Sequence, residues 1–123
     1  MLTSTTQAVE ADRVGAVREL SRAYGDCVVV LKGHQTLIGA SKGPVFINPS
    51  GNPGLAQGGA GDVLAGFIGG LLAQREFHDD LWTAVRYAVW QHGAAADFLA
   101  ARQEHWTIEE LVGVMGATPR PDA

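Results

Sequence analysis

The first third of the chain changes from helical spacing of its apolar residues to a continuous apolar run. The residues that recur near helical spacing are Val9, Val14, Val17 and Leu20. Ser4 and Gln7 before them fit a capping box, and Gly25 is a plausible stop, so this segment predicts an amphipathic helix. Residues 27–31 are a short apolar run rich in valine, which predicts a strand buried on both faces. Together they predict half of a parallel α/β layer.

A hairpin, a loop and further helices are predicted after this strand. Residues 36–40 and 45–48 read as two short strands joined by the turn signal Ser-Lys-Gly-Pro. Residues 49–61 are rich in glycine and proline and predict a loop. Residues 62–73 predict an apolar helix, in which Gly66, Gly69 and Gly70 would permit close packing against a sheet.

The last third predicts one long and one short helix. The long helix covers residues 80–101. Its expected inner face consists of Leu81, Val85, Ala88, Val89, His92, Ala96 and Leu99. Thr107 and Glu110 form a second capping box that opens the short helix. We therefore expect one partial domain over residues 1–117 and a flexible tail over residues 118–123.

Composition limits the possible partners and compartments. The chain has 123 residues, 46% of them hydrophobic, and a formal net charge of -4, which argues against binding nucleic acid through its phosphates. The single cysteine, Cys27, is expected to be a small buried residue and excludes an internal disulfide. The N-terminus does not resemble a signal peptide, and the apolar stretch 63–73 is too short to span a bilayer. The sequence thus predicts a soluble cytoplasmic protein.

The chemistry is expected in the glycine-rich loop. Three of the four residues before Asp62 are glycine, so the backbone can approach a ligand closely. A helix follows, and its unpaired N–H groups would favour a phosphate. Asp62 beside that phosphate could serve as a general acid or base. The alternative from spacing alone is that Asp62 caps the helix.

Three motifs give the chain a family resemblance. Residues 48–64 contain Gly-Asn-Pro-Gly-Leu-Ala and Gly-Gly-Ala-Gly-Asp-Val-Leu, residues 32–36 read Lys-Gly-His-Gln-Thr, and residues 91–95 read Gln-His-Gly-Ala-Ala. In this order they resemble the ADP-dependent NAD(P)H-hydrate dehydratase family. The resemblance extends from about Thr5 to Val114 and implies the C-terminal part of an α/β, three-layer ribokinase-like fold, with a β-hairpin and a glycine-rich anion loop leading into a helix.

The resemblance also implies a reaction and a set of site residues. Family members are hydro-lyases that return hydrated NADH or NADPH to the normal cofactor, consuming ADP or ATP, with Mg²⁺ expected beside the phosphates. Asp62 is the implied catalytic and substrate-binding residue. The implied nucleotide-binding residues are Lys32, Gly33, His34, Gln35, Thr36, Asn52, Pro53, Gly54, Leu55, Ala56, Gln57, Gly58, Gly59, Ala60 and Gly61. No dedicated metal-ligand set is visible in the sequence.

The chain also departs from the family pattern. Ala60 and Gln57 replace a frequent Thr or Ser and a frequent Thr, and nothing matches the family's N-terminal half. We therefore expect a homo-oligomer or a complex with that half. Two other functions stay open, namely a small-molecule kinase of the same fold and a non-catalytic nucleotide-binding fragment.

The histidines and tryptophans carry weaker expectations. His92 is expected to be a core residue rather than a ligand, and His34 could contact the nucleotide. His78 and His105 are expected on the surface. His78, Asp79 and Asp80 could suggest a metal site, but carboxylates before a helix are more simply N-terminal charges. The three tryptophans are expected to pack in the core or at a subunit contact.

Overall fold

A computed structural model describes residues 9, 11–117 of the chain. The chain divides into two compact units, Met1–Asn48 and Pro49–Ala123, and each is described by itself. The predicted capping box at Ser4 and Gln7 and the predicted tail at 118–123 lie outside the described residues. Within the described residues, no helix has the length and apolar character needed to cross a membrane.

The first unit opens with the helix α2, Arg13–Ala23. It begins where the Asp12 side chain accepts a hydrogen bond from the Gly15 N–H, which satisfies one of the unpaired amides at the helix start. Val17 is fully buried, as the apolar spacing predicts. Val14 is 47% exposed, however, so the prediction that it belongs to the inner face is wrong.

The sheet of this unit consists of β1 (Val29–Leu31), β2 (Leu37–Gly39) and β3 (Phe46–Ile47). The strands pair antiparallel in the order β1-β2-β3, with Val30 opposite Ile38 and Ile38 opposite Phe46. The predicted hairpin is therefore confirmed. The described strands contain no parallel pair, so β1 lies at the edge of this sheet and the parallel layer expected from the sequence is not formed by the described residues.

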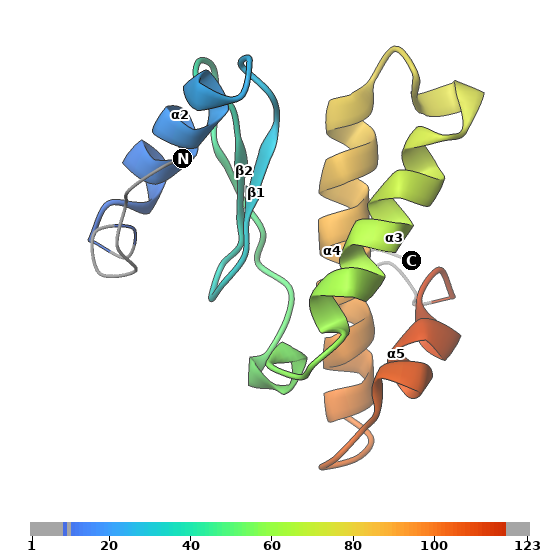
Figure 1. Ribbon diagram of the computed structural model, residues 1–123. Coiled ribbons are helices and arrows are strands. Elements are labelled where there is room, and N and C mark those ends of the chain that lie inside the picture. The colour runs from blue at the N-terminus through green and yellow to red at the C-terminus, as the bar shows by residue number, and fades with distance from the viewer. Residues whose placement is uncertain (1–8, 10, 118–123) are drawn as a thin grey trace. The chain divides into compact units, whose positions relative to one another are not determined.

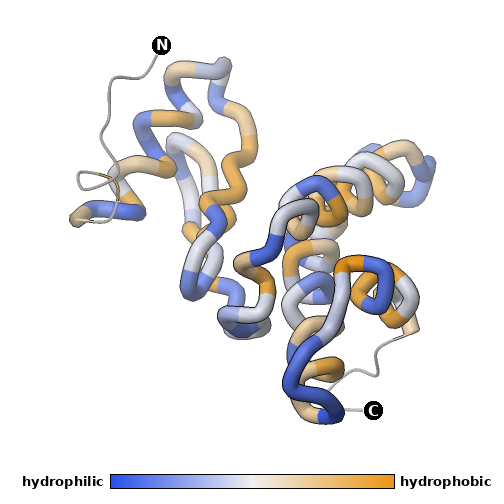
Figure 2. Tube along the Cα trace, turned by 60° about the horizontal axis from the view of Figure 1, so that its bottom comes forward, coloured by the Kyte–Doolittle hydropathy of each residue, from blue (hydrophilic) through white to orange (hydrophobic). Residues whose placement is uncertain are grey.

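The chain before and along β1 is continuously apolar (Figure 2). This run is less buried than predicted. Only residues 29–31 form the strand, and Val29 alone among them is buried. Cys27 is exposed, so the expectation of a buried cysteine is wrong. The reason is that Gly25 and Asp26 both take positive φ, and the chain is still leaving this turn at Cys27.

Helix α2 lies against the sheet (Figure 1), where a small apolar core and polar side chains hold it. The core consists of Val17, Val29 and Leu37. Buried Ser21 donates through Oγ to the Cys27 carbonyl (2.6 Å) and accepts from the Ser41 N–H (2.8 Å). These bonds satisfy a buried hydroxyl and fix the start of the hairpin turn.

The second unit is helical. It contains α3 (Ala60–Leu72), α4 (Leu81–Ala100) and α5 (Ile108–Val114), with short 3-10 helices η1 (Pro53–Leu55) and η2 (Arg75–Phe77). Helix α4 contacts both α3 and α5, as Figure 1 shows. The predicted inner face of α4 is confirmed except at Leu81, which is 41% exposed.

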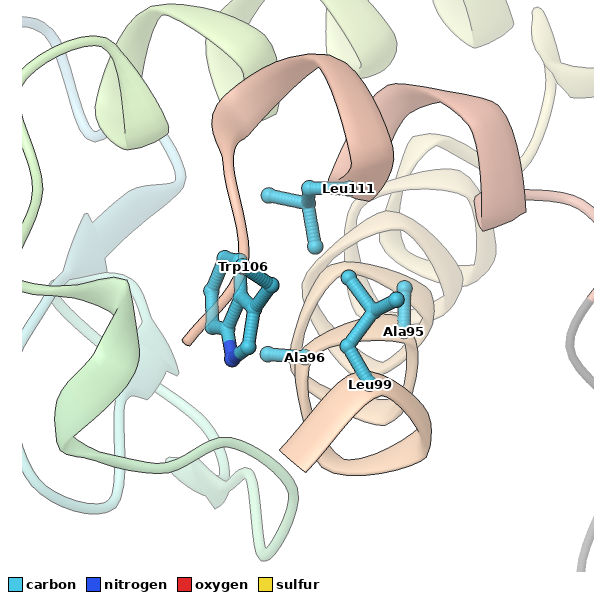
Figure 3. Close-up of a cluster of buried hydrophobic side chains, with 5 residues drawn as sticks. All are labelled: Ala95, Ala96, Leu99, Trp106 and Leu111. Carbon is cyan, nitrogen blue, oxygen red and sulfur yellow. The ribbon is translucent and has the colours of Figure 1, made fainter. Parts of the chain in front are cut away.

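A cluster of buried side chains joins α4 to α5. Its members are Ala95, Ala96, Leu99, Trp106 and Leu111 (Figure 3). Trp106 lies just before α5, and its ring packs beside Ala96 of α4. The predicted capping box is confirmed, because Thr107 Oγ1 accepts from the Glu110 N–H while the Glu110 carboxylate accepts from the Thr107 N–H.

The glycines of α3 do not have the surroundings expected from the sequence. A Cβ atom built at Gly66, Gly69 or Gly70 would meet nothing within 4 Å. The prediction that they permit close packing is therefore not met by the described residues. These three glycines instead form an exposed face of the helix.

Candidate functional site

The glycine-rich loop ends in a left-handed turn that starts α3. Gly59 is the N-cap residue with φ 97°, a conformation that favours glycine. Asp62 is the third residue of the helix and is exposed. The alternative that Asp62 caps the helix is therefore wrong. Its carboxylate is left accessible in the first turn of α3, where a negative charge is favoured by the helix dipole.

The first turn of α3 has backbone N–H groups available for an anion. The Ala60 N–H donates to the Gln57 carbonyl (3.3 Å) and the Val63 N–H to the Gly59 carbonyl (3.0 Å). Among the residues that the structure describes, no acceptor is seen for the N–H groups of Gly61 and Asp62. Gly58 beside them has no atom within 4 Å of a Cβ built on it, so the backbone there is open to a ligand.

The earlier part of the loop is held by its own side chains. Asn52 Oδ1 accepts from the Gly54 N–H (2.9 Å) and so caps the 3-10 helix η1, in which Pro53 takes the first position. Gln57 Nε2 donates to the Gly54 carbonyl (2.8 Å). Gln57, which departs from the family pattern, thus ties η1 to the residues that lead into α3.

The backbone of Gly54 lies close to the ring of Trp106. A Cβ at Gly54 would stand 2.6 Å from Trp106 Cζ2 and 2.8 Å from Asn52 Oδ1. Glycine is needed here because backbone, side-chain amide and indole meet in one place. The expectation that Trp106 packs in the core is confirmed, and its ring supports the loop.

His92 supports the far end of the loop from α4. It is buried, and its Nε2 lies 2.9 Å from the Ala60 carbonyl oxygen. Because a carbonyl oxygen only accepts, the ring nitrogen donates this bond. The prediction of a core histidine is confirmed. Its partner at the start of α3 is a contact that the helical pattern of α4 does not reveal.

The other predicted nucleotide segment, residues 32–36, belongs to the first unit. It forms the turn between β1 and β2, in which Gly33 and Gln35 have positive φ. Lys32 and His34 are exposed, and Thr36 Oγ1 donates to the Gly33 carbonyl (3.3 Å). The segment is therefore a defined turn with an exposed lysine at its start.

Arg13 of α2 organises this turn, a role that the sequence pattern does not predict. Its guanidinium donates to the carbonyls of His34 (2.8 Å), Gln35 (3.1 Å) and Leu31 (3.2 Å). A Cβ at Gly33 would also stand 3.2 Å from Arg13 Nη2. These contacts join residues about twenty positions apart, and the helical pattern around Arg13 gives no sign of them.

The described residues hold no group of three or more His, Cys, Asp and Glu side chains that could bind a metal ion. His78 and His105 are exposed, as expected. Asp80 is the N-cap of α4, where bonds from the Thr83 hydroxyl and N–H hold the pKa of its carboxyl below the usual value.

The fold places the chain in the ribokinase-like class of proteins. Its solved neighbours include a ribokinase-like superfamily protein from Enterococcus faecalis, which is 31% identical with a TM-score of 0.67, covering 85% of this chain and 34% of that one. The family profile of NAD(P)H-hydrate dehydratase matches residues 1–113. The chain belongs to this NAD(P)H-hydrate dehydratase family, and the fold and family expected from the sequence are confirmed.

Two curated relatives and one solved structure have names that refer to NAD(P)H-hydrate. The ADP-dependent (S)-NAD(P)H-hydrate dehydratase of Neisseria meningitidis is 46% identical over 99 residues, which are 80% of this chain and 32% of that protein. The bifunctional NAD(P)H-hydrate repair enzyme Nnr of Escherichia coli is 43% identical over 83% of this chain and 19% of its own length. The ADP/ATP-dependent NAD(P)H-hydrate dehydratase of Bacillus subtilis, co-crystallized with ATP/Mg²⁺, is 33% identical with a TM-score of 0.79, covering 91% of this chain and 40% of that one.

The chain spans a third or less of the length of these two curated relatives. It matches only part of each of them, as the sequence resemblance implied. The three motifs at residues 32–36, 48–64 and 91–95 nevertheless all lie within the matched residues 1–113.

Proposed function

We propose that this chain supplies the adenine-nucleotide-binding part of an enzyme that dehydrates hydrated NADH or NADPH at the expense of ADP or ATP. The observation that carries the proposal is the start of α3, where left-handed Gly59 leads into the unpaired N–H groups of Gly61 and Asp62. This is an anion-binding arrangement. The names of the relatives, which include ADP or ATP, support a nucleotide phosphate as this anion.

The remaining implied site residues are proposed on the same ground. Residues 52–61 would wrap the nucleotide, and the turn 32–36 would contact it, with Lys32 supplying a positive charge. Mg²⁺ would accompany the phosphates, which is supported by the Bacillus subtilis relative co-crystallized with ATP/Mg²⁺. A cytoplasmic location stays a prediction.

Asp62 would carry the chemistry. Hydroxide is a poor leaving group, whereas a phosphate ester leaves readily. In the proposed step the substrate hydroxyl oxygen attacks the terminal phosphorus of the nucleotide, whose bridging P–O bond breaks. The exposed Asp62 carboxylate accepts the hydroxyl proton. Phosphate then departs with the C–O bond pair, and transfer of a ring proton to water restores the nicotinamide double bond.

The rest of the family domain is the proposed partner. The chain covers 40% of the Bacillus subtilis dehydratase, β1 lies at the edge of the described sheet, and the Gly66–Gly69–Gly70 side of α3 is open. Both features would be covered by further parts of one domain. We propose that substrate turnover requires this remaining part.

Calorimetry with ADP and ATP tests nucleotide binding by the chain itself. We expect saturable binding, and Asp62→Asn should leave the affinity nearly unchanged because backbone N–H groups hold the phosphate. In the assembly with the rest of the domain, the same variant should lose dehydration. A folded chain that shows no binding heat at millimolar nucleotide contradicts the proposal. An equal loss of affinity and rate in Asp62→Asn would assign that residue a structural role instead.

A further inference from the structure

Both carboxylate oxygens of Asp97 hold the beginning of the glycine-rich loop. Asp97 lies near the end of α4 and is exposed. Its Oδ2 accepts from the Gly51 N–H (2.9 Å), and its Oδ1 accepts from Asn52 Nδ2 (3.0 Å). Hydrogen bonds to an ionised acceptor are stronger than neutral ones. An exposed aspartate on a helix would ordinarily face water, so this double contact with a loop about 45 residues away is specific.

The same face of α4 makes further contacts with this loop. Ser50 Oγ donates to the Trp90 carbonyl (2.9 Å). At Gly93, a Cβ would stand 2.6 Å from the Ser50 carbonyl carbon and 2.8 Å from the Gly51 nitrogen. The loop backbone therefore rests directly on the helix at a position that only glycine permits. Positions 90, 93 and 97 follow helical spacing, so they form one stripe.

The loop is thus fixed to one helix at both ends. Asp97 and Gly93 hold residues 50–52, while His92 holds the Ala60 carbonyl at the start of α3. Binding of phosphate by backbone N–H groups depends on their being aligned before the ligand arrives, because ordering a loop on binding reduces affinity. The segment Asn52 to Gly61 has glycines at 54, 58, 59 and 61, so it has much conformational freedom to lose.

We propose that Asp97 is a positioning residue, which preorders the loop 51–61 for nucleotide through Gly51 and Asn52. This inference rests on the proposed nucleotide-binding function of the loop. It does not require Asp97 to touch the nucleotide. These contacts also explain the His-Gly pair of the family motif. His92 bonds to the end of the loop at Ala60, and Gly93 allows its beginning to lie against α4.

A swap of the two side chains tests the proposal. In Asp97→Asn, the new side chain can accept from the Gly51 N–H, but its amide then faces the amide of Asn52, donor against donor. In the double variant Asp97→Asn with Asn52→Asp, the position-97 amide donates to the new carboxylate, which can still accept from the Gly54 N–H. The net charge also returns to that of the natural chain. Asp79→Asn removes one exposed charge elsewhere and is the matched control.

Amide hydrogen exchange of residues 51–61 and the dissociation constant for ATP are measured on all four chains. We expect Asp97→Asn to speed amide exchange in this loop. It should also raise the dissociation constant for ATP about tenfold, which corresponds to the loss of one net hydrogen bond. The double variant should recover the slow exchange of the loop, and Asp79→Asn should change neither the exchange nor the ATP affinity. Unchanged loop exchange in Asp97→Asn overturns the proposal. Faster exchange throughout residues 49–117 without recovery in the double variant also overturns it, since it indicates a general structural role. If the natural chain binds no ATP, the proposed function fails, while the exchange data still decide the role of Asp97.

Discussion

Replacing Gly93 by alanine should separate helix propensity from packing of the glycine-rich loop. Gly93 is fully enclosed in α4, and an added Cβ would stand 2.6 Å from the Ser50 carbonyl carbon and 2.8 Å from the Gly51 nitrogen. Both atoms belong to backbone, so no rotamer change can relieve the clash. The loop must move away, which also strains the Ser50–Trp90 hydrogen bond.

The magnitude follows from three effects. Alanine in a helix interior is favoured over glycine by up to about 1 kcal/mol. Overpacking costs about 1–3 kcal/mol, and a lost hydrogen bond costs about 1 kcal/mol. Gly69→Ala in α3 is the matched control, because its Cβ would meet nothing within 4 Å and only the propensity gain applies. The two variants should therefore differ by about 2–4 kcal/mol in the free energy of unfolding.

Urea unfolding followed by circular dichroism measures this difference, and calorimetry with ATP measures its effect on the loop. We expect Gly69→Ala to be slightly more stable than the natural chain in isolation. Gly93→Ala should be less stable and should bind ATP more weakly. A Gly93→Ala chain as stable as Gly69→Ala, with unchanged ATP affinity, would refute the contact between α4 and the loop.

Two further predictions concern the capping box and the assembly. Bonds from the Thr107 N–H and from Gln103 hold the pKa of Glu110 below its usual value of 4.5, so the ionised carboxylate stabilises the fold. This contribution is complete above the unfolded pKa and disappears as pH falls through the folded pKa. Glu110→Gln should therefore lower the melting temperature near neutral pH, with a difference that narrows in acid. A gap that stays constant down to acid pH would contradict this linkage. Sedimentation of the isolated chain should show concentration-dependent association through the β1 edge and the open face of α3, relieved by adding the rest of the family domain; a strictly monomeric, cooperatively folded chain would contradict the proposed partner surface.

Local signals determined much of this protein. The capping box at Thr107 and Glu110, the hairpin turn and the long α4 each depend on residues a few positions apart, so the sequence predicts them. The three family motifs likewise indicate the family from the sequence alone. The predicted start of α3 at residue 62 is wrong, since the helix begins at Ala60. The glycine that caps the helix lies three residues before Asp62 and looks like part of the loop.

Contacts between distant residues were decided only by the tertiary structure. Arg13 reaches the carbonyls of the 32–36 turn, and Asp97 holds Gly51 and Asn52, although neither residue departs from an ordinary amphipathic helix in sequence. The exposure of Cys27 was also decided by the tertiary structure. This residue belongs to an apolar run, but it is exposed because it lies where the chain leaves a turn. Periodicity reports which residues share a face, whereas burial and hydrogen-bond partners depend on which other segment covers that face. The sequence therefore determined the elements and the family, and the tertiary structure decided which side chains hold the loop.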